Sequence, residues 1–384
     1  MKIKNLKMLT IVSLTLFVGF VGYALVYTQI IPYMESLGIN AQSRGLVLTS
    51  SAIIAIVVQL FTGYLSDRYQ MIKGITIIVH LMFGLFSFLG YTRWINQSIS
   101  LYFVLIMLAV ALFRVVSNLL ESWIYEINEE TQKHFGILRL FGSLGWAIGA
   151  YLVSILVNQG GYHVIGKVVG LLMILDVSLM IFMPAPPKSL TALSINTKDI
   201  QKLFKNKQYV LMLIIFFWLF MINNLSGLTV IDRLLELKAT SSDISQFWSL
   251  QAISEMVLMV GGGFFIAKFG GKKILIFVSC IIALRFVLYG LADSSQQIII
   301  ISLLQGIIFP FLLLVQKRMV ARHTPIELRS SGHMVMTAVT SNIPIIITPV
   351  LSGFLIQNFA ISQILVFAGL SCIIPLFLSF MAID

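Results

Sequence analysis

The chain has 384 residues, of which 58% are hydrophobic and 11% charged, and its mean hydropathy is +0.97. Soluble domains carry about 25% charged residues, so this composition excludes a soluble enzyme or binding module and predicts a polytopic membrane protein. The net charge of +11 does not indicate nucleic-acid binding, because basic residues gather on one side of a membrane for reasons of topology.

Twelve apolar runs follow one another along the chain, and each is long enough to span a bilayer, which takes about 20 residues. The first run is too long for a signal peptide and lacks a small-residue cleavage site, so we expect it to be retained. The sequence therefore predicts an all-α membrane protein with twelve transmembrane helices. The predicted spans are 8–32, 44–66, 73–92, 99–124, 136–158, 163–184, 208–231, 244–267, 274–292, 297–320, 331–356 and 361–382.

One long polar segment, 185–207, divides these helices six and six. We expect an amino-terminal bundle over 1–184, a linker over 185–207 and a carboxy-terminal bundle over 208–384. With the amino terminus inside, 18 of the 26 lysines and arginines fall on the inner side and five in outer loops, Arg44 among them. This asymmetry predicts that both termini and the linker are cytoplasmic.

The two halves repeat a motif at a distance of 200 residues. Gly63-Tyr-Leu-Ser-Asp67-Arg68 is followed by Lys73, and the second half has Gly263-Phe-Phe-Ile-Ala267-Lys268 followed by Lys273. Two pseudo-symmetric six-helix bundles related as parallel repeats are typical of secondary transporters, whose site lies where the repeats meet.

Two opposite charges, Glu121 and Arg139, lie in or beside apolar runs. A charge at membrane depth costs about 2.5–3.5 kcal/mol even on the insertion scale, and such residues commonly pair and mark a substrate or ion path. Arg139, Ser143 and Trp146 share one face of their helix at about 100° per residue. A second face carries the small residues Gly142, Gly145 and Gly149, which suits close helix packing.

The segment GYLSDRYQMIK (63–73) resembles the loop between helices 2 and 3 of the major facilitator superfamily. The resemblance implies that Gly63, Asp67, Arg68 and Lys73 tie neighbouring helices together and influence the opening of the halves. A plain basic loop on the inner side is the alternative.

The stretch ESWIYEINEETQKHFGILRLFGSLGWA (121–147) resembles the helix 4–5 region of the lactose permease group, which includes phenylpropionate and nucleoside permeases. The resemblance implies that Glu121 and Arg139 bind polar groups of a solute and that Trp146 stacks on a ring. A purely structural ion pair between helices 4 and 5 is the alternative.

The segment GGKKILIFVSCIIALR (270–285) resembles helix 9 of the same group and places Arg285 on a functional arginine. Glu255 lies near a functional acid of helix 8, and pairing with Arg285 is a natural hypothesis.

Helices 7 and 10 depart from the lactose permease pattern. Asn223 and Asn224 stand where that pattern has acids, and Gln305 and Ile308 stand at its helix-10 His and proton-carrying Glu. These three polar residues remain candidates for solute contact, while Glu255 and Asp176 are the candidate proton carriers. Burial of a carboxyl group favours its protonated form, which suits that role.

Taken together, the sequence predicts a secondary active transporter of the cell membrane that moves a sugar, nucleoside or aromatic acid by alternating access, with proton symport as the expected coupling. Drug or metabolite efflux and a solute sensor without translocation are the alternatives. No catalytic set, metal constellation or cofactor motif is visible, so an enzyme is not expected. The expected partners are a small solute, protons and the lipid bilayer, with no nucleic acid, and a monomer is expected.

Overall fold

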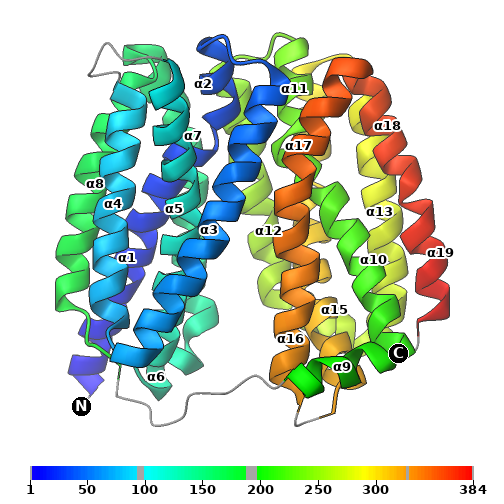
Figure 1. Ribbon diagram of the computed structural model, residues 1–384, viewed down its shortest axis with the longest axis horizontal. Helices are drawn as coiled ribbons and strands as arrows, with labels where there is room; N and C mark the ends of the chain where they lie inside the picture. Colours follow the sequence, from blue (N-terminus) through cyan, green and yellow to red (C-terminus); the bar gives the residue numbers. More distant parts are fainter. Residues whose placement is uncertain (1, 93–98, 187–196, 326–327, 383–384) are drawn as a thin grey trace. The chain divides into compact units, whose positions relative to one another are not determined.

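The computed structural model describes residues 2–92, 99–186, 197–325 and 328–382, which are helical throughout apart from short turns (Figure 1). Up to residue 186 the helices are α1 (Lys2–Tyr27), α2 (Ile30–Ser36), α3 (Ala41–Tyr69), α4 (Ile72–Thr92), α5 (Ile99–Glu126), α6 (Glu129–Lys133), α7 (Phe135–Gly160) and α8 (His163–Phe182). From residue 197 they are α9 (Thr197–Lys205), α10 (Lys207–Asn224), the 3₁₀ turn η1 (Leu225–Gly227), α11 (Thr229–Glu236), α12 (Ser241–Phe269), α13 (Gly271–Leu291), α14 (Ser295–Ser302), α15 (Gln305–His323), α16 (Arg329–Thr337), the π-helical η3 (Ala338–Asn342), α17 (Ile343–Asn358), α18 (Ile361–Ser371) and α19 (Ile373–Met381).

Eleven spans of the described chain are long and apolar enough to cross a membrane, and α12, bent by 57° after Met259, makes twelve. The predicted all-α fold with twelve transmembrane helices is therefore confirmed. Several spans are broken rather than continuous: α1 and α2 together form the first, and α10, η1 and α11 form the seventh.

The predicted linker 185–207 is only partly visible. Residues 187–196 lie outside the described part of the chain, and the remainder is not all loop, because Thr197–Lys205 forms α9. Leu203 of α9 is buried at 2% exposure, so this helix packs against neighbouring helices through an apolar side chain.

Contacts between Cα atoms group the chain into two compact units that do not follow the sequence halves strictly. Unit 1 comprises residues 1–38, 50–192 and 244–252, and unit 2 comprises 39–49, 193–243 and 253–384. Thus the first turns of α3 belong to unit 2, and residues 244–252 of α12 belong to unit 1. The predicted bundle boundaries at 184 and 208 stay predictions.

In unit 1 the closest helix pair is α1 with α7, and glycines make that approach possible. A Cβ on Gly145 would collide with the carbonyl oxygen of Phe17, and one on Gly149 would lie 2.6 Å from the carbonyl oxygen of Val21. The predicted small-residue face of this helix therefore does pack against a neighbour, as expected where van der Waals contact drives helix association in lipid.

Unit 2 uses the same device between α13 and α18. A Cβ on Gly290 would lie 2.6 Å from the carbonyl oxygen of Ser362, and one on Gly369 would lie 2.7 Å from that of Ala283. Both units thus contain close backbone-to-backbone helix contacts that only glycine permits.

The inner-loop lysines also make matching contacts in the two units. Lys73 donates to the carbonyl oxygens of Ile181 and Met183 at 2.8 and 2.6 Å, and Lys272 donates to that of Phe380 at 2.7 Å. Each lysine satisfies carbonyl groups at the end of the last transmembrane helix of its unit, which have no partner within the helix. The repeat in the sequence aligns Lys73 with Lys273, whereas the lysine that makes the corresponding contact is Lys272.

Candidate functional site

The ion pair of Glu121 and Arg139 is the centre of the candidate site in unit 1. Nε of Arg139 on α7 lies 2.6 Å from Oε1 of Glu121 on α5, and the two side chains keep 35% and 30% of their surface exposed. Nη1 of Arg139 donates to Oγ of Ser143 at 3.3 Å. The charges are therefore partnered and still accessible, as a solute-binding pair requires.

The guanidinium of Arg139 also lies over an aromatic ring, with its central carbon 4.5 Å from the centroid of Phe20 on α1. Gly142, one turn along α7, leaves room for this ring, because a Cβ there would lie 3.2 Å from Phe20 Cδ2. The ring fixes the plane of the guanidinium by a cation–π contact and leaves Nη2 available to an acceptor.

A cluster of four aromatic rings continues the same face of α7 beyond the ion pair. Trp146 lies 6.0 Å from Tyr27, 5.7 Å from Phe113 and 6.4 Å from Trp248 between ring centroids. Tyr27 and Trp248 are themselves 5.9 Å apart, so the four rings form one wall. Rings at these distances offer a flat apolar surface with polar edges.

Two hydrogen-bond donors in or beside this wall have no hydrogen-bond partner among the described residues. Nε1 of Trp248 is buried and unbonded, and so is Nε of Arg114, whose guanidinium lies 5.9 Å from the Tyr27 ring. Buried donors without a partner are costly, so these groups are free to bind a solute. Trp248 was not predicted from the sequence, because its contacts with Tyr27 and Trp146 join segments that are far apart in the chain.

Unit 2 holds a separate set of polar candidates. Arg285 is fully buried and donates from Nε to Tyr289 Oη at 2.9 Å and from Nη1 to Gln305 Oε1, while its Nη2 has no hydrogen-bond partner in the described chain. Gln305 therefore binds Arg285 directly. The pairing of Arg285 with Glu255 stays a prediction.

The other predicted positions of unit 2 are half-buried. Asn223 and Asn224 form the last turn of α10, and Oδ1 of Asn223 is buried without a partner among the described residues. Glu255 lies within α12. Their roles in binding stay predictions.

Asp176 does have neighbours, although the sequence indicated no obvious partner for it. It is completely buried on α8, next to His80 of α4 and close to Tyr23 of α1. Both neighbours are distant from it in the chain, on the first and third spans.

The inner-loop motif is described in part. Arg68 donates to Tyr64 Oη and is exposed, Lys73 binds the carbonyl oxygens of Ile181 and Met183, and a Cβ on Gly63 would meet open space in the described structure. The side chain of Asp67 lies outside what the structure describes. The role of this motif in opening stays a prediction.

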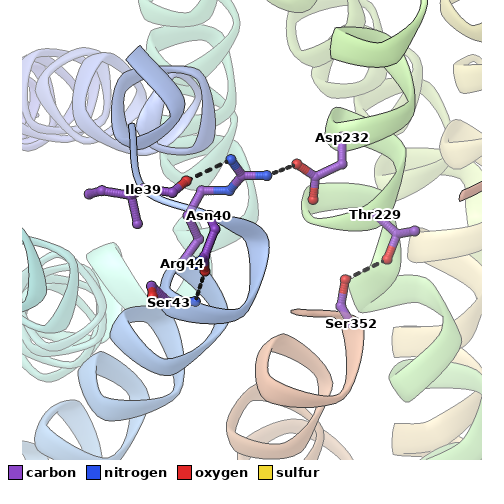
Figure 2. A network of polar contacts seen from close by, with 7 residues as sticks. All are labelled: Ile39, Asn40, Ser43, Arg44, Thr229, Asp232 and Ser352. Atoms are coloured by element: carbon purple, nitrogen blue, oxygen red, sulfur yellow. Dashed lines mark hydrogen bonds and ion pairs between the residues drawn. The ribbon is translucent and has the colours of Figure 1, made fainter. Parts of the chain in front are cut away.

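An ion pair that the sequence did not indicate lies in unit 2. Figure 2 shows Arg44, at the start of α3, linked to Asp232 of α11 and to the carbonyl oxygen of Ile39. Nη2 of Arg44 donates to Asp232, and Nη1 donates to the carbonyl oxygen of Ile39 at 3.1 Å. The side chains of the pair are only 10% and 9% exposed. Arg44 was counted among the outer-loop charges with no partner named for it, and its outer location stays a prediction.

A shallow groove of about 510 Å³ opens between α4 and α8 in unit 1. Its surface is apolar and is lined mainly by residues such as Leu85, Phe88 and Leu171. A surface of that kind suits lipid chains, and Lys167 is the one charged residue among those that line it, so we do not place the site there. Among the described residues no group of three His, Cys, Asp or Glu side chains is arranged to hold a metal ion.

The family model that matches the chain is the MFS_1 like family, over residues 9–381. The chain is 27% identical to the uncharacterized transporter YwbF of Bacillus subtilis (strain 168) over 292 residues, covering 74% of this chain and 71% of that protein. It is 21% identical to the maltose permease of Geobacillus stearothermophilus over 368 residues, covering 95% and 92% of the two chains. The raffinose permease of Escherichia coli is 22% identical over 312 residues, covering 73% and 69%.

Solved structures are similar over the whole chain. The nucleoside transporter NupG has a TM-score of 0.83 at 17% identity, covering 98% of this chain and 98% of that one. A D-xylose-proton symporter has a TM-score of 0.76 at 13% identity, covering 100% and 98%. At these identities the likeness establishes the fold.

Proposed function

The chain belongs to the MFS_1 like family and is a membrane transporter of the major facilitator type, and on that premise we propose that it moves a sugar or nucleoside by proton-coupled symport. The observation that carries the proposal is the ion pair of Glu121 and Arg139, whose side chains are 30% and 35% exposed, together with the aromatic wall of Trp146. A transporter of this type is not an enzyme.

The chemistry of the pair favours a solute rich in hydroxyl groups. A guanidinium donates two parallel hydrogen bonds and a carboxylate accepts from hydroxyl groups, so the two together bind a diol in a defined orientation. Trp146 and Tyr27 supply a flat surface for the ring that carries the diol. An aromatic acid would use Arg139 but would leave Glu121 facing a negative charge.

The relatives support the same solute class. The maltose, raffinose, nucleoside and D-xylose transporters named above act on solutes that share a ring bearing hydroxyl groups. Such a ring is the common feature that the pair and the aromatic wall are suited to bind.

In unit 2 the buried Arg285, with Gln305 as its acceptor, forms a second candidate set together with Asn223 and Asn224. We expect Arg285 Nη2 and Asn223 Oδ1 to be its solute-binding atoms, because both are buried without a partner in the described chain. The movement proposed is alternating access, in which Gly63, Asp67, Arg68 and Lys73 influence the opening.

The protein is proposed to reside in the cell membrane with both termini in the cytoplasm, following its basic inner loops. The partners proposed are the solute, protons and lipid, and a monomer is the expected working unit.

The solute is identified by binding to purified protein in detergent across labelled sugars, nucleosides and aromatic acids. We expect one sugar or nucleoside to bind, binding to be lost in Arg139→Ala, and binding to persist in Arg322→Ala, which removes an arginine of the last turn of α15 that belongs to neither candidate set. Binding of an aromatic acid alone would contradict the proposed solute class. Wild-type affinity in Arg139→Ala would contradict the site.

A further inference from the structure

A buried polar cluster inside unit 1 is not explained by solute binding. It consists of Tyr23 of α1, His80 of α4 and Asp176 of α8, and each of the three is 0% exposed. Oδ2 of Asp176 lies 3.6 Å from Nε2 of His80, and the same nitrogen is hydrogen-bonded to Oη of Tyr23. Neither carboxyl oxygen of Asp176 has a hydrogen-bond partner among the described residues.

One hydrogen bond of His80 places a hydrogen on Nδ1, and for the neutral ring this also sets the role of Nε2. Nδ1 lies 2.9 Å from the carbonyl oxygen of Thr76, and because a carbonyl only accepts, Nδ1 carries a hydrogen. In the neutral imidazole Nε2 is then an acceptor, and the Tyr23 hydroxyl donates to it. Nε2 of His80, which faces Asp176, therefore presents a lone pair that already accepts a hydrogen bond from Tyr23.

A negative carboxylate does not fit these surroundings. It would be buried without a donor and would face the lone pair of His80, which is among the costliest arrangements inside a protein. A neutral carboxylic acid carries no such penalty. We propose that Asp176 is the proton-binding group of the transport cycle, that it holds its proton in the conformation described, and that His80 and Tyr23 are its positioning residues.

The proposal rests on the proton-coupled transport proposed above and names the group that carries the proton. The titratable groups that face the carboxyl are His80 from α4 and Tyr23 from α1, and Glu121 of α5 acts electrostatically on Tyr23. Gly19 of α1 lets the carboxyl approach that helix, since a Cβ there would lie 2.8 Å from Oδ2.

Release of the proton follows from the same geometry. The O–H bond of Asp176 breaks, the electron pair stays on the carboxylate, and the proton passes to a water molecule admitted by a small separation of α1 from α8. The carboxylate then needs a donor, and Tyr23 supplies it by turning its whole side chain, so that the hydroxyl leaves His80 and donates to the carboxylate. One proton leaves per cycle.

The ring of Tyr23 links this event to the solute site. It lies 5.1 Å from Phe20, edge to face, and 5.8 Å from Phe113 between centroids. Phe20 is the ring under the guanidinium of Arg139, and Phe113 contacts Trp146. A turn of Tyr23 therefore moves the two rings that shape the solute site, which couples the proton to the solute.

The test compares two modes of transport in proteoliposomes containing the full chain and the solute identified by binding. Exchange of labelled for unlabelled solute needs no net proton movement, whereas accumulation driven by an acidic exterior does. We expect Asp176→Asn, a neutral substitution of nearly the same shape, to retain exchange and to lose accumulation, so that the inside-to-outside ratio falls to one. Asp293→Asn, which replaces an exposed acid, should retain both.

The outcomes separate this proposal from the proposed function. Accumulation of solute by Asp176→Asn at the wild-type level would overturn the proton site. Exchange without any accumulation in the wild-type protein would also overturn it, while leaving solute transport intact. Absence of both exchange and accumulation in the wild-type protein would count against the proposed function instead. In that case infrared spectroscopy decides whether Asp176 binds the proton.

That measurement is infrared spectroscopy of the purified wild-type protein, which distinguishes a protonated carboxyl group from a carboxylate. We expect a carboxylic acid band that is absent in Asp176→Asn and present in Asp293→Asn, and its absence in the wild-type protein would overturn the proposal.

Tyr23→Phe covers the case in which Asp176→Asn does not fold. It removes the donor that stabilises the carboxylate, so the pH at which the acid band is half-lost should rise by about half to one unit. An unchanged midpoint in Tyr23→Phe would exclude Tyr23 as a positioning residue. An unchanged midpoint together with no band that depends on Asp176 would exclude the proton site itself.

Discussion

Replacing both members of the Glu121–Arg139 pair distinguishes a solute-binding pair from a structural one. Arg139→Gln alone leaves Glu121 as an isolated acid, and Glu121→Gln alone leaves Arg139 as an isolated cation. The double variant removes both charges and keeps two side chains that bond to one another. A structural pair and a binding pair give opposite results in this double variant.

The magnitudes follow from the exposure of the pair, 35% and 30%. Breaking a buried pair costs about 3–5 kcal/mol, and breaking a surface pair about 0–1 kcal/mol. A pair about one-third exposed lies between, so each single variant should lose about 1–2 kcal/mol of stability. The double variant should regain most of it. For the solute, each lost charged hydrogen bond is worth about 1.5–3 kcal/mol, or about 10- to 140-fold in Kd.

The assay combines thermal unfolding in detergent with equilibrium binding of the labelled solute, as a double-mutant cycle. We expect the double variant to melt close to the wild-type protein and to bind at least as weakly as either single variant. Binding restored to within about threefold of the wild-type Kd would refute the reasoning and make the pair structural.

Three further perturbations test other parts of the structure. Trp146→Ala should weaken solute binding about tenfold or more by removing the ring contact, while Trp146→Tyr should retain most of the affinity. Gly145→Val should lower the stability of unit 1 by about 1–3 kcal/mol, seen as a lower melting temperature, because the new side chain collides with the backbone of Phe17. Asp232→Asn should destabilise the protein by about 3 kcal/mol in the same assay, because it leaves the buried Arg44 without its anion.

Matched substitutions serve as controls for these three. Gly136→Val adds the same side chain on α7 where a Cβ meets open space, and Asp293→Asn removes an exposed acid. Equal melting temperatures for Gly145→Val and Gly136→Val would contradict the close contact of α1 with α7. Equal melting temperatures for Asp232→Asn and Asp293→Asn would mean that the Arg44–Asp232 pair contributes nothing to stability. Equal solute affinity in Trp146→Ala and Trp146→Tyr would mean that the aromatic wall is not part of the binding site.

The spans and one face of α7 were predictable because their causes are local. Apolar run length specifies a membrane helix, and 100° per residue places Gly142, Gly145 and Gly149 together. The expected pairing of Glu121 with Arg139 was also within reach, because an isolated charge in lipid needs a partner and the two are close in sequence.

The contacts that join distant segments were not predictable. Nothing in the sequence around Asp176 indicates His80, 96 residues earlier, because the contact depends on how α4 packs against α8. Charge counting likewise gave no sign of the partner of Arg44, since a sum of basic residues takes no account of a buried acid such as Asp232. The place of Trp248 in the aromatic wall was unpredictable for the same reason, because it depends on residues 244–252 of α12 packing in unit 1.

The most direct test of the central claim is uptake of labelled sugars and nucleosides into proteoliposomes containing the purified protein, with the external pH recorded at the same time. The account predicts that one solute enters, that its entry makes the exterior more alkaline, and that both signals disappear in Arg139→Ala but not in Arg322→Ala. Uptake that proceeds in Arg139→Ala as in the wild-type protein, or an exterior that acidifies as the solute enters, would contradict it.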